Sequence, residues 1–160
     1  MIPANLTAQT AALGIALGLI FSVVCYLTTN LSPGGMITPG WIALTLITDV
    51  QLAALMMLVA GATYLTTKLV QRTVILYGKR LFAAVILSAV LIQTTVILIL
   101  SHEFPLLYTS QTLGFIVPGL VSYQMVRQPL AATLISTTAV TLATYVVLIS
   151  GLLIGFLPTG

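Results

Sequence analysis

Two matching hexapeptides hold the residues of this chain that could do chemistry. Gly35–Gly40 has the sequence Gly-Met-Ile-Thr-Pro-Gly and Gly114–Gly119 has the sequence Gly-Phe-Ile-Val-Pro-Gly, 79 positions further on. Proline and glycine both interrupt helices, so we expect a helix to restart after each Pro-Gly pair. The first amides of a helix lack partners within it and carry partial positive charge. The two strings therefore predict one anion-attracting centre, formed by two helix starts related by a pseudo-two-fold axis. The candidate residues are Gly35, Pro39, Gly40, Gly114, Pro118 and Gly119.

The alternative interpretation of these strings is structural. Glycine lets helices approach closely, and a Pro-Gly break in lipid needs either tight packing or a polar opening for the freed backbone groups. The two breaks would then be packing kinks. That they match in both halves of the chain favours a working site, because paired Gly/Pro interruptions mark such sites in membrane proteins.

A basic cluster is the second candidate. It consists of residues on both sides of a Tyr-Gly pair, together with one isolated arginine: Arg72, Tyr77, Gly78, Lys79, Arg80 and Arg127. These side chains could bind an anionic substrate or the acidic face of a cytoplasmic partner. The alternative is that they only fix topology and touch anionic lipid heads. The Tyr-Gly interruption resembles a shaped turn, which favours recognition.

The sequence does not predict catalysis by this chain alone. Its carboxylates are Asp49 and Glu103, and nothing requires them to converge. Cys25 is the one cysteine. We find no phosphate loop, nucleophile elbow or metal-ligand cluster, and so expect no catalytic residue, metal or cofactor here. A net charge of +3 is too small to favour nucleic acid.

Composition indicates the elements that must position these residues. Hydrophobic residues make up 59% of the chain, charged residues 4%, and mean hydropathy is +1.20. A soluble domain carries about 25% charged residues, so the expected solvent is lipid. Continuous apolar runs favour helices over a barrel. Four runs can span, at roughly 7–28, 50–70, 81–101 and 130–156, and two Gly/Pro-broken segments lie at 31–48 and 107–126.

The order of segments predicts an internal duplication. Each half, about 7–70 and 81–156, has a long span, a broken segment and a second long span. Ala62-Thr63-Tyr64 also recurs as Ala143-Thr144-Tyr145. We therefore expect one all-α integral membrane domain over residues 1–160, a polytopic helix bundle with two repeats. Basic residues favour the cytoplasmic side. If 107–126 crosses, Arg127 joins the other basic residues inside, which predicts inverted three-plus-three repeats. Four spans with two re-entrant hairpins are the alternative.

Three blocks then resemble a known family. Leu31–Leu44 contains the first hexapeptide, 74–84 has the sequence Val-Ile-Leu-Tyr-Gly-Lys-Arg-Leu-Phe-Ala-Ala, and Gly114–Leu120 contains the second hexapeptide. Their sequence, order and spacing are similar to those of the membrane subunit of bacterial poly-γ-glutamate synthases, called CapC or PgsC. The resemblance runs from about residue 15 to 150. The chain departs from the family after the first span, at Thr28–Ser32, where members carry charge.

The resemblance implies a multi-pass subunit in the bacterial cytoplasmic (inner) membrane that serves capsule biosynthesis. It implies a cytoplasmic Mur-ligase-like partner, which would hold ATP and Mg²⁺, and a membrane-anchored extracellular partner. The anionic polyglutamate would be exported along dipolar and cationic groups. Two alternatives stay open: a self-sufficient small transporter working as a homo-oligomer, and a passive membrane anchor for the ligase.

Overall fold

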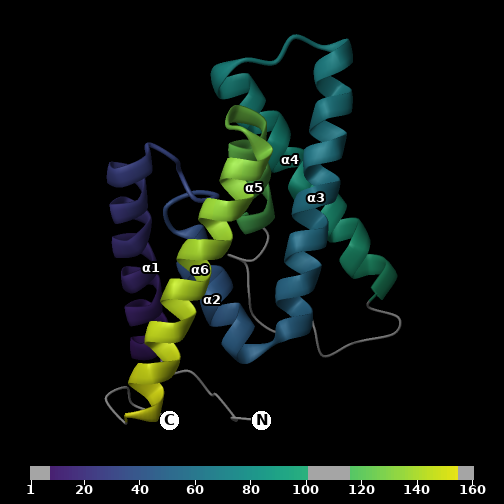
Figure 1. Cartoon of the computed structure of the whole chain (residues 1–160). Helices are drawn as coiled ribbons and strands as arrows, with labels where there is room; N and C mark the ends of the chain where they lie inside the picture. The colour runs from purple at the N-terminus through teal and green to yellow at the C-terminus, as the bar shows by residue number, and fades with distance from the viewer. Residues whose placement is uncertain (1–7, 101–115, 155–160) are drawn as a thin grey trace. The chain divides into compact units, whose positions relative to one another are not determined.

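Six α-helices make up the described part of the chain, residues 8–100 and 116–154, in a computed structural model (Figure 1). They are α1 (Ala8–Thr29), α2 (Thr38–Thr48), α3 (Val50–Thr73), α4 (Gly78–Leu100), α5 (Val117–Arg127) and α6 (Leu130–Leu153). These residues contain no strand. The all-α prediction is confirmed.

Four of the helices, α1, α3, α4 and α6, are long and apolar enough to cross a membrane. Their bounds lie within about three residues of the four runs expected from the sequence. The other two, α2 and α5, have 11 residues each. At 1.5 Å per residue such a helix rises about 16 Å, roughly half of a ~30 Å hydrocarbon core.

The Pro-Gly pairs lie inside the first turns of α2 and α5. We expected each helix to restart after its pair, but the helices begin one residue before the proline, at Thr38 and Val117. Proline is tolerated there because the first amides of a helix have no partner in it and the ring fixes a helical φ. The pairs are therefore helix starts.

The segment before α2 is not helical. Gly34 and Gly35 have φ values of +61° and +106°, which side chains other than glycine rarely adopt. Pro33 precedes them and is buried. α1 ends directly before Asn30, whose φ is +56°, and the Pro-Gly-Gly sequence then returns the chain to α2. The corresponding segment before α5 includes Gly114 and lies outside the described residues.

The helices group into two compact units that do not coincide with the sequence halves. The first unit contains α1, α2 and α6, and the second contains α4, α5 and α3 from Ala54 onward. Each unit therefore takes one long helix from the other half of the sequence. Whether the chain is one membrane domain with repeat halves stays a prediction.

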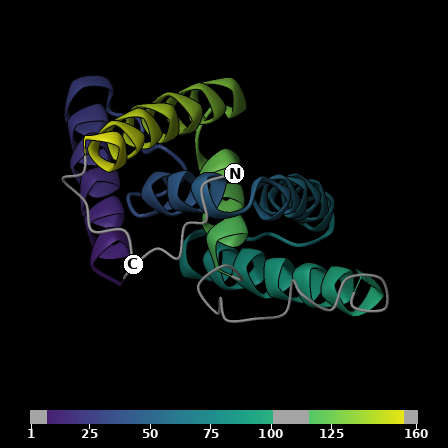
Figure 2. The same ribbon diagram turned by 90° about the horizontal axis from the view of Figure 1, so that it is seen from below.

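In the first unit, α2 packs against both α1 and α6 (Figure 2). Ala43 and Leu44 of α2 meet Leu148 of α6, and Ile15 and Leu17 of α1 pack against this cluster. The contacts of Gly14 with Leu44 and of Gly18 with Gly40 show that α1 and α2 run in opposite directions. The start of α2 thus lies beside the middle of α1.

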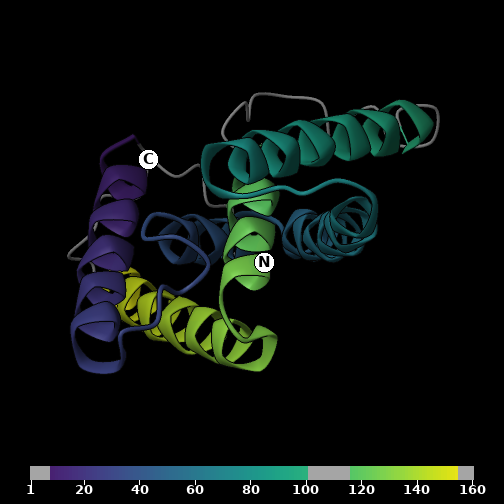
Figure 3. The same cartoon turned by 90° about the horizontal axis from the view of Figure 1, so that it is seen from above.

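In the second unit, α5 lies against the first half of α4 (Figure 3). Gly119 meets Ile86 and Ala89, and Tyr123 meets Phe82, so these two helices also run in opposite directions. A four-residue turn at 74–77 joins the end of α3 to the start of α4. The end of α5, the end of α3 and the start of α4 therefore lie at one end of this unit.

Small and polar residues fill the helix seams, while large apolar side chains face outward. Every fourth residue is buried along α1 and along α4: Thr10, Gly14, Gly18 and Ser22, then Leu81, Val85, Ala89 and Gln93. By contrast, Leu27 and Leu153 are 75% and 77% exposed. Helices that associate in lipid use small residues at their contacts and leave apolar side chains to the lipid, so this arrangement fits a membrane solvent.

Candidate functional site

The start of α2 touches the backbone of α1. A Cβ added at Gly40 would lie 2.9 Å from the carbonyl oxygen of Gly14, 3.1 Å from Cα of Ile15 and 3.2 Å from Cα of Gly18. One added at Gly18 would collide with the backbone of Gly40. Gly14 and Gly18 form a Gly-x-x-x-Gly pattern, the spacing that allows close helix approach in membranes. The packing interpretation of the first break is thus supported by direct contacts.

The start of α5 is packed less tightly. A Cβ at Gly119 would lie 2.9 Å from the Ile86 side chain and 3.1 Å from Cβ of Ala89. Ser122, one turn on, lies 2.7 Å from the carbonyl oxygens of both Pro118 and Ala60. Its single hydroxyl proton can serve one of them at a time. The Ala60 contact ties α5 to α3 inside the second unit.

Both short helices begin part-way along a long one. Gly18 is 11 residues before the end of α1, and Ile86 and Ala89 are 8 and 11 residues after the start of α4. At 1.5 Å per residue these levels lie about 12–16 Å from a helix end. The side chains at the start of α2 give it no capping hydrogen bond. Each dipole's positive end is therefore near mid-depth of its partner helix. Whether the two starts share one centre stays a prediction.

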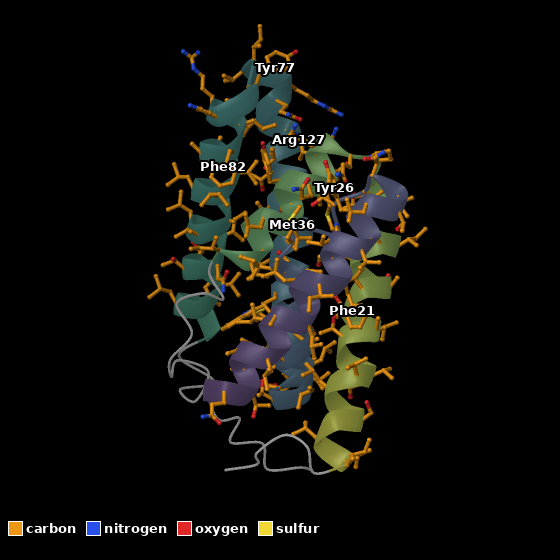
Figure 4. The ribbon with its side chains drawn as sticks, turned by 90° about the vertical axis from the view of Figure 1, so that its left-hand side faces the viewer. Phe21, Tyr26, Met36, Tyr77, Phe82 and Arg127 are labelled. Carbon is orange, nitrogen blue, oxygen red and sulfur yellow. The ribbon has the colours of Figure 1, made fainter. Side chains whose placement is uncertain are left out.

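The chain's five Lys and Arg residues all lie at one end of the second unit. Lys68 and Arg72 are in the last two turns of α3, Lys79 and Arg80 are in the first turn of α4, and Arg127 ends α5. In Figure 4 the labelled Tyr77 and Arg127 lie toward this same end. The sequence grouped Arg127 with the other basic residues only if segment 107–126 crosses the membrane. In the structure, the antiparallel contact of α5 with α4 brings Arg127 to the end of the second unit that holds the other four. We call these five side chains the cationic end.

The turn at 74–77 projects beyond the cationic end. Ile75 and Tyr77 are each 79% exposed. Gly78 starts α4 with a φ of +58°, and a Cβ there would meet nothing within 4 Å. Glycine is therefore required by the backbone conformation and not by a neighbour. This geometry agrees with the shaped turn that the Tyr-Gly pair suggested.

An aromatic pair positions Arg127. The rings of Phe82 and Tyr123 meet edge to face, with centroids 5.2 Å apart and planes at 87°. The guanidinium of Arg127 lies 5.5 Å from the centre of the Tyr123 ring, and its Nη1 donates to the Tyr123 hydroxyl over 3.2 Å. Lys68 similarly lies 5.8 Å from the Tyr64 ring. These contacts hold two of the five cations close to the helices.

Other sequence candidates have local roles. Asp49 caps α3: its Oδ1 accepts hydrogen bonds from the amides of Gln51 and Leu52, at 2.9 and 3.3 Å. Glu103 and Gly114 lie outside the described residues. Within residues 8–100 and 116–154, His, Cys, Asp and Glu side chains form no group of three that could hold a metal ion.

Sequence reasoning missed the residues that contact the helix starts. Gly18 and Ser22 of α1, and Ser122 of α5, were not singled out. Gly14 and Gly18 had a signal, the Gly-x-x-x-Gly spacing within an apolar run. Ser122 had none, because its partner Ala60 lies 62 positions away in the sequence.

Four helices long and apolar enough to cross a membrane, with the basic side chains gathered at one end of a unit, are features of a helical membrane protein. The sequence profile of the family described as Capsule biosynthesis CapC matches residues 17–134. The chain belongs to this family.

Two curated relatives extend the match over most of the chain. The capsule biosynthesis protein CapC of Bacillus anthracis is 29% identical over 140 residues, covering 85% of this chain and 89% of the relative. The PGA biosynthesis protein CapC of Bacillus subtilis (strain 168) is 28% identical over 145 residues, covering 85% and 91%. No solved structure gives a significant match.

Proposed function

We propose that this chain is the membrane subunit of a poly-γ-glutamate synthase and export complex, coupling a cytoplasmic ligase to movement of the anionic polymer across the membrane. The observation that carries this proposal is the family match over residues 17–134, together with relatives named for capsule and PGA biosynthesis. The chain itself holds no evident catalytic constellation, so we assign synthesis, with ATP and Mg²⁺, to a Mur-ligase-like partner. A membrane-anchored extracellular subunit would receive the polymer.

An inverted repeat is the topology that we propose for this subunit. The buried stripes of α1 and α4 both have four members spaced four residues apart, and the third member meets the Pro-Gly glycine of the following short helix. Five buried positions of α3 also recur 81 positions later in α6. They are Met56, Val59, Ala60, Thr63 and Thr67, followed by Thr137, Val140, Thr141, Thr144 and Leu148. Matched burial in two pairs of helices, α1 with α4 and α3 with α6, supports a duplication.

A path for polyglutamate needs groups that favour carboxylates. The cationic end would meet the polymer, or the acidic face of the ligase, on the cytoplasmic side of the inner membrane, where basic residues are favoured. The starts of α2 and α5 would offer partial positive charge deeper in the membrane. Neither group requires an acidic side chain, and the six described helices contain no Asp or Glu; Asp49 lies between α2 and α3.

The test is to neutralise part of the cationic end. We expect the triple change Lys79→Gln, Arg80→Gln and Arg127→Gln to reduce extracellular polymer at least ten-fold in cells whose capsule depends on this chain. Co-purification of the ligase should fall with it if the cations bind the ligase, and should persist if they guide the polymer. The matched control is Lys79→Arg, Arg80→Lys and Arg127→Lys, which keeps all three charges.

Two results would sink the proposal. One is normal polymer yield and normal ligase association in the neutral triple variant. The other is full extracellular polymer when an unrelated membrane anchor fused to the ligase replaces this chain, because a passive anchor would then suffice. If polymer moved into vesicles that contain this chain alone, the chain would be a self-sufficient transporter and not a subunit that couples a ligase to export.

A further inference from the structure

Three buried hydroxyls in the first unit have no hydrogen-bond partner among the described residues. They are Ser22 Oγ of α1, Thr38 Oγ1 of α2 and Thr141 Oγ1 of α6, and the residues are 0%, 0% and 4% exposed. Their neighbours behave differently: Thr137 and Thr144 of α6 donate to backbone carbonyls one turn earlier, over 2.7 and 2.8 Å. A buried hydroxyl without a partner costs about 1–3 kcal/mol, so three of them on three helices call for an explanation.

The three hydroxyls lie at one level of the unit. Ser22 is four residues beyond Gly18, which meets Gly40, so it lies about 6 Å past the Gly40 level. In Figure 1 α6 runs in the same direction as α2, so Thr141, seven residues before Leu148, lies about 10 Å from Ala43 and Leu44 toward the start of α2. The distances of Ser22, Thr38 and Thr141 from Ala43, measured along the α2 axis toward the start of α2, therefore agree to within about one helical turn.

Helix periodicity turns two of these side chains toward the seam. Ser22 continues the stripe of Gly14 and Gly18, which meets α2, because residues four apart share a helix face. Thr141 shares a face with Leu148, which meets α2, because seven residues make nearly two turns. Thr38 is the first residue of α2. The hydroxyls therefore come from three helices to the positive end of the α2 dipole.

This group of atoms can donate hydrogen bonds and carries no negative charge. Each hydroxyl has one proton to donate. Ile37 at the N-cap makes no side-chain hydrogen bond to the first turn of α2. Pro39 has no amide proton, and the Trp41 amide donates to the Ile37 carbonyl. The subsite can therefore use the amides of Thr38 and Gly40, at a helix start that attracts anions. A metal cation would be repelled by the same dipole and would find no carboxylate among the three residues. The matching ligand is a carboxylate, which accepts several hydrogen bonds at once.

We propose that Ser22, Thr38 and Thr141, with the first turn of α2, form a carboxylate-binding subsite. It rests on the proposed function, because the carboxylate would belong to a glutamate unit of the polymer. The subsite gives the first hexapeptide a ligand at mid-depth of the first unit. It also gives the three unpaired buried hydroxyls a hydrogen-bond partner.

Binding to the purified full chain in nanodiscs tests the subsite. The probe is a pentamer of glutamate joined through γ-amides, and the neutral comparison is the pentamer of the same length with amidated side chains. We expect the acidic pentamer to raise the thermal unfolding temperature saturably and the neutral one not to. Ser22→Ala and Thr141→Val should each weaken the apparent affinity about ten-fold, as expected for loss of one hydrogen bond to a charged group.

The ligand-free proteins give a second readout. Ser22→Ala and Thr141→Val remove an unpaired buried hydroxyl, so their unfolding temperatures without probe should equal or exceed that of the unchanged chain. A purely structural role for the hydroxyls would lower them. Thr144→Val is the matched control, on the same helix with its hydroxyl already bonded to Val140, and it should leave the pentamer affinity unchanged.

Three outcomes would overturn the subsite. They are equal protection by both pentamers, equal protection by chloride at the same concentration, and unchanged affinity in Ser22→Ala and Thr141→Val. The first and third outcomes would mean that buried water, and not a carboxylate, is the hydrogen-bond partner of the hydroxyls. None of these bears on the cell test of the cationic end, so the subsite can fail while the proposed function stands. Conversely, if the pentamer binds as expected but an unrelated membrane anchor restores extracellular polymer in cells, the proposed function fails and the subsite stands.

Discussion

Gly40 has no room for a side chain, because the first turn of α2 lies directly on the backbone of α1. We expect Gly40→Ala to destabilise the purified chain by about 1–3 kcal/mol, the usual cost of overpacking, since the added Cβ would lie 2.9 Å from the carbonyl of Gly14. The measurement is the temperature at which half of the detergent-purified protein leaves the monodisperse peak in size-exclusion chromatography.

Gly61 provides the control for that change. It lies inside α3, and a Cβ there would meet nothing within 4 Å. Gly61→Ala should therefore keep the transition temperature or raise it, since alanine favours helix over glycine by up to about 1 kcal/mol. If Gly40→Ala and Gly61→Ala behaved alike, close packing at the first hexapeptide would not be what requires glycine.

At the residue scale the sequence identified the Pro-Gly pairs but not their surroundings. Pro39 and Gly40 could be predicted as a helix start because local backbone chemistry decides it. Ser22 and Thr141 could not be predicted as neighbours of that start, because they lie on helices that meet α2 only through tertiary packing. Hydroxyl residues are common in the described helices, and most bond locally to a preceding carbonyl. Only burial and missing partners distinguish these two.

At the element scale the long helices were predictable because apolar length alone indicates them. The positions of the short helices were predictable, but their first residues were not. Proline is favoured in the first turn of a helix, and this preference does not fix whether the helix begins at the proline or one residue before it. Thr48-Asp49 is a polar pair at the junction of α2 and α3. Its detailed role, with Asp49 capping α3 while α2 ends one residue earlier, depends on backbone geometry at the junction.

Asp49 gives a prediction for the α2 to α3 junction. Asp49→Ala should lower the stability of the chain by about 0.5–2 kcal/mol, the usual cost of losing an N-cap side chain. Asp49→Asn is the matched variant, because asparagine caps helices about as well as aspartate, and it should stay close to the unchanged chain. Thermal unfolding in detergent measures both. Equal losses in the two variants would mean that the charge of Asp49 matters more than its cap.

At the scale of the whole molecule, the grouping of helices could not be predicted from the sequence. The order of segments predicted one domain with two repeat halves and did not say which helices pack together: α6 joins α1 and α2, and most of α3 joins α4 and α5. Exchange of the third helix of each half, α3 and α6, requires contacts between segments about 100 positions apart, such as Ala43 with Leu148. Hydrophobic patterning carries no information on which apolar helices pair, because every long helix here exposes apolar residues on most faces.

Crossing number is the property of the whole chain that a single experiment can decide. α3 runs unbroken from Val50 to Thr73, so Gln51 and the turn at 74–77 lie at opposite ends of one helix. Arg127 lies at the same end of the second unit as that turn. In a Cys25→Ala background, we expect a membrane-impermeant maleimide to label Gln51→Cys in intact cells. Tyr77→Cys and Arg127→Cys should be labelled only after permeabilisation.

The choice of Gln51 over Asp49 keeps the cap of α3 intact, and Tyr77→Cys marks the side on which the cationic end lies. In the six-segment arrangement the chain between α4 and the end of α5 crosses the membrane, which brings Arg127 to the cytoplasmic side with the other basic residues. In the arrangement with four spans and two re-entrant hairpins, α5 would return to the outer side. Labelling of Gln51→Cys and Arg127→Cys from the same side would therefore rule out the inverted repeat, and labelling from opposite sides would rule out the hairpins.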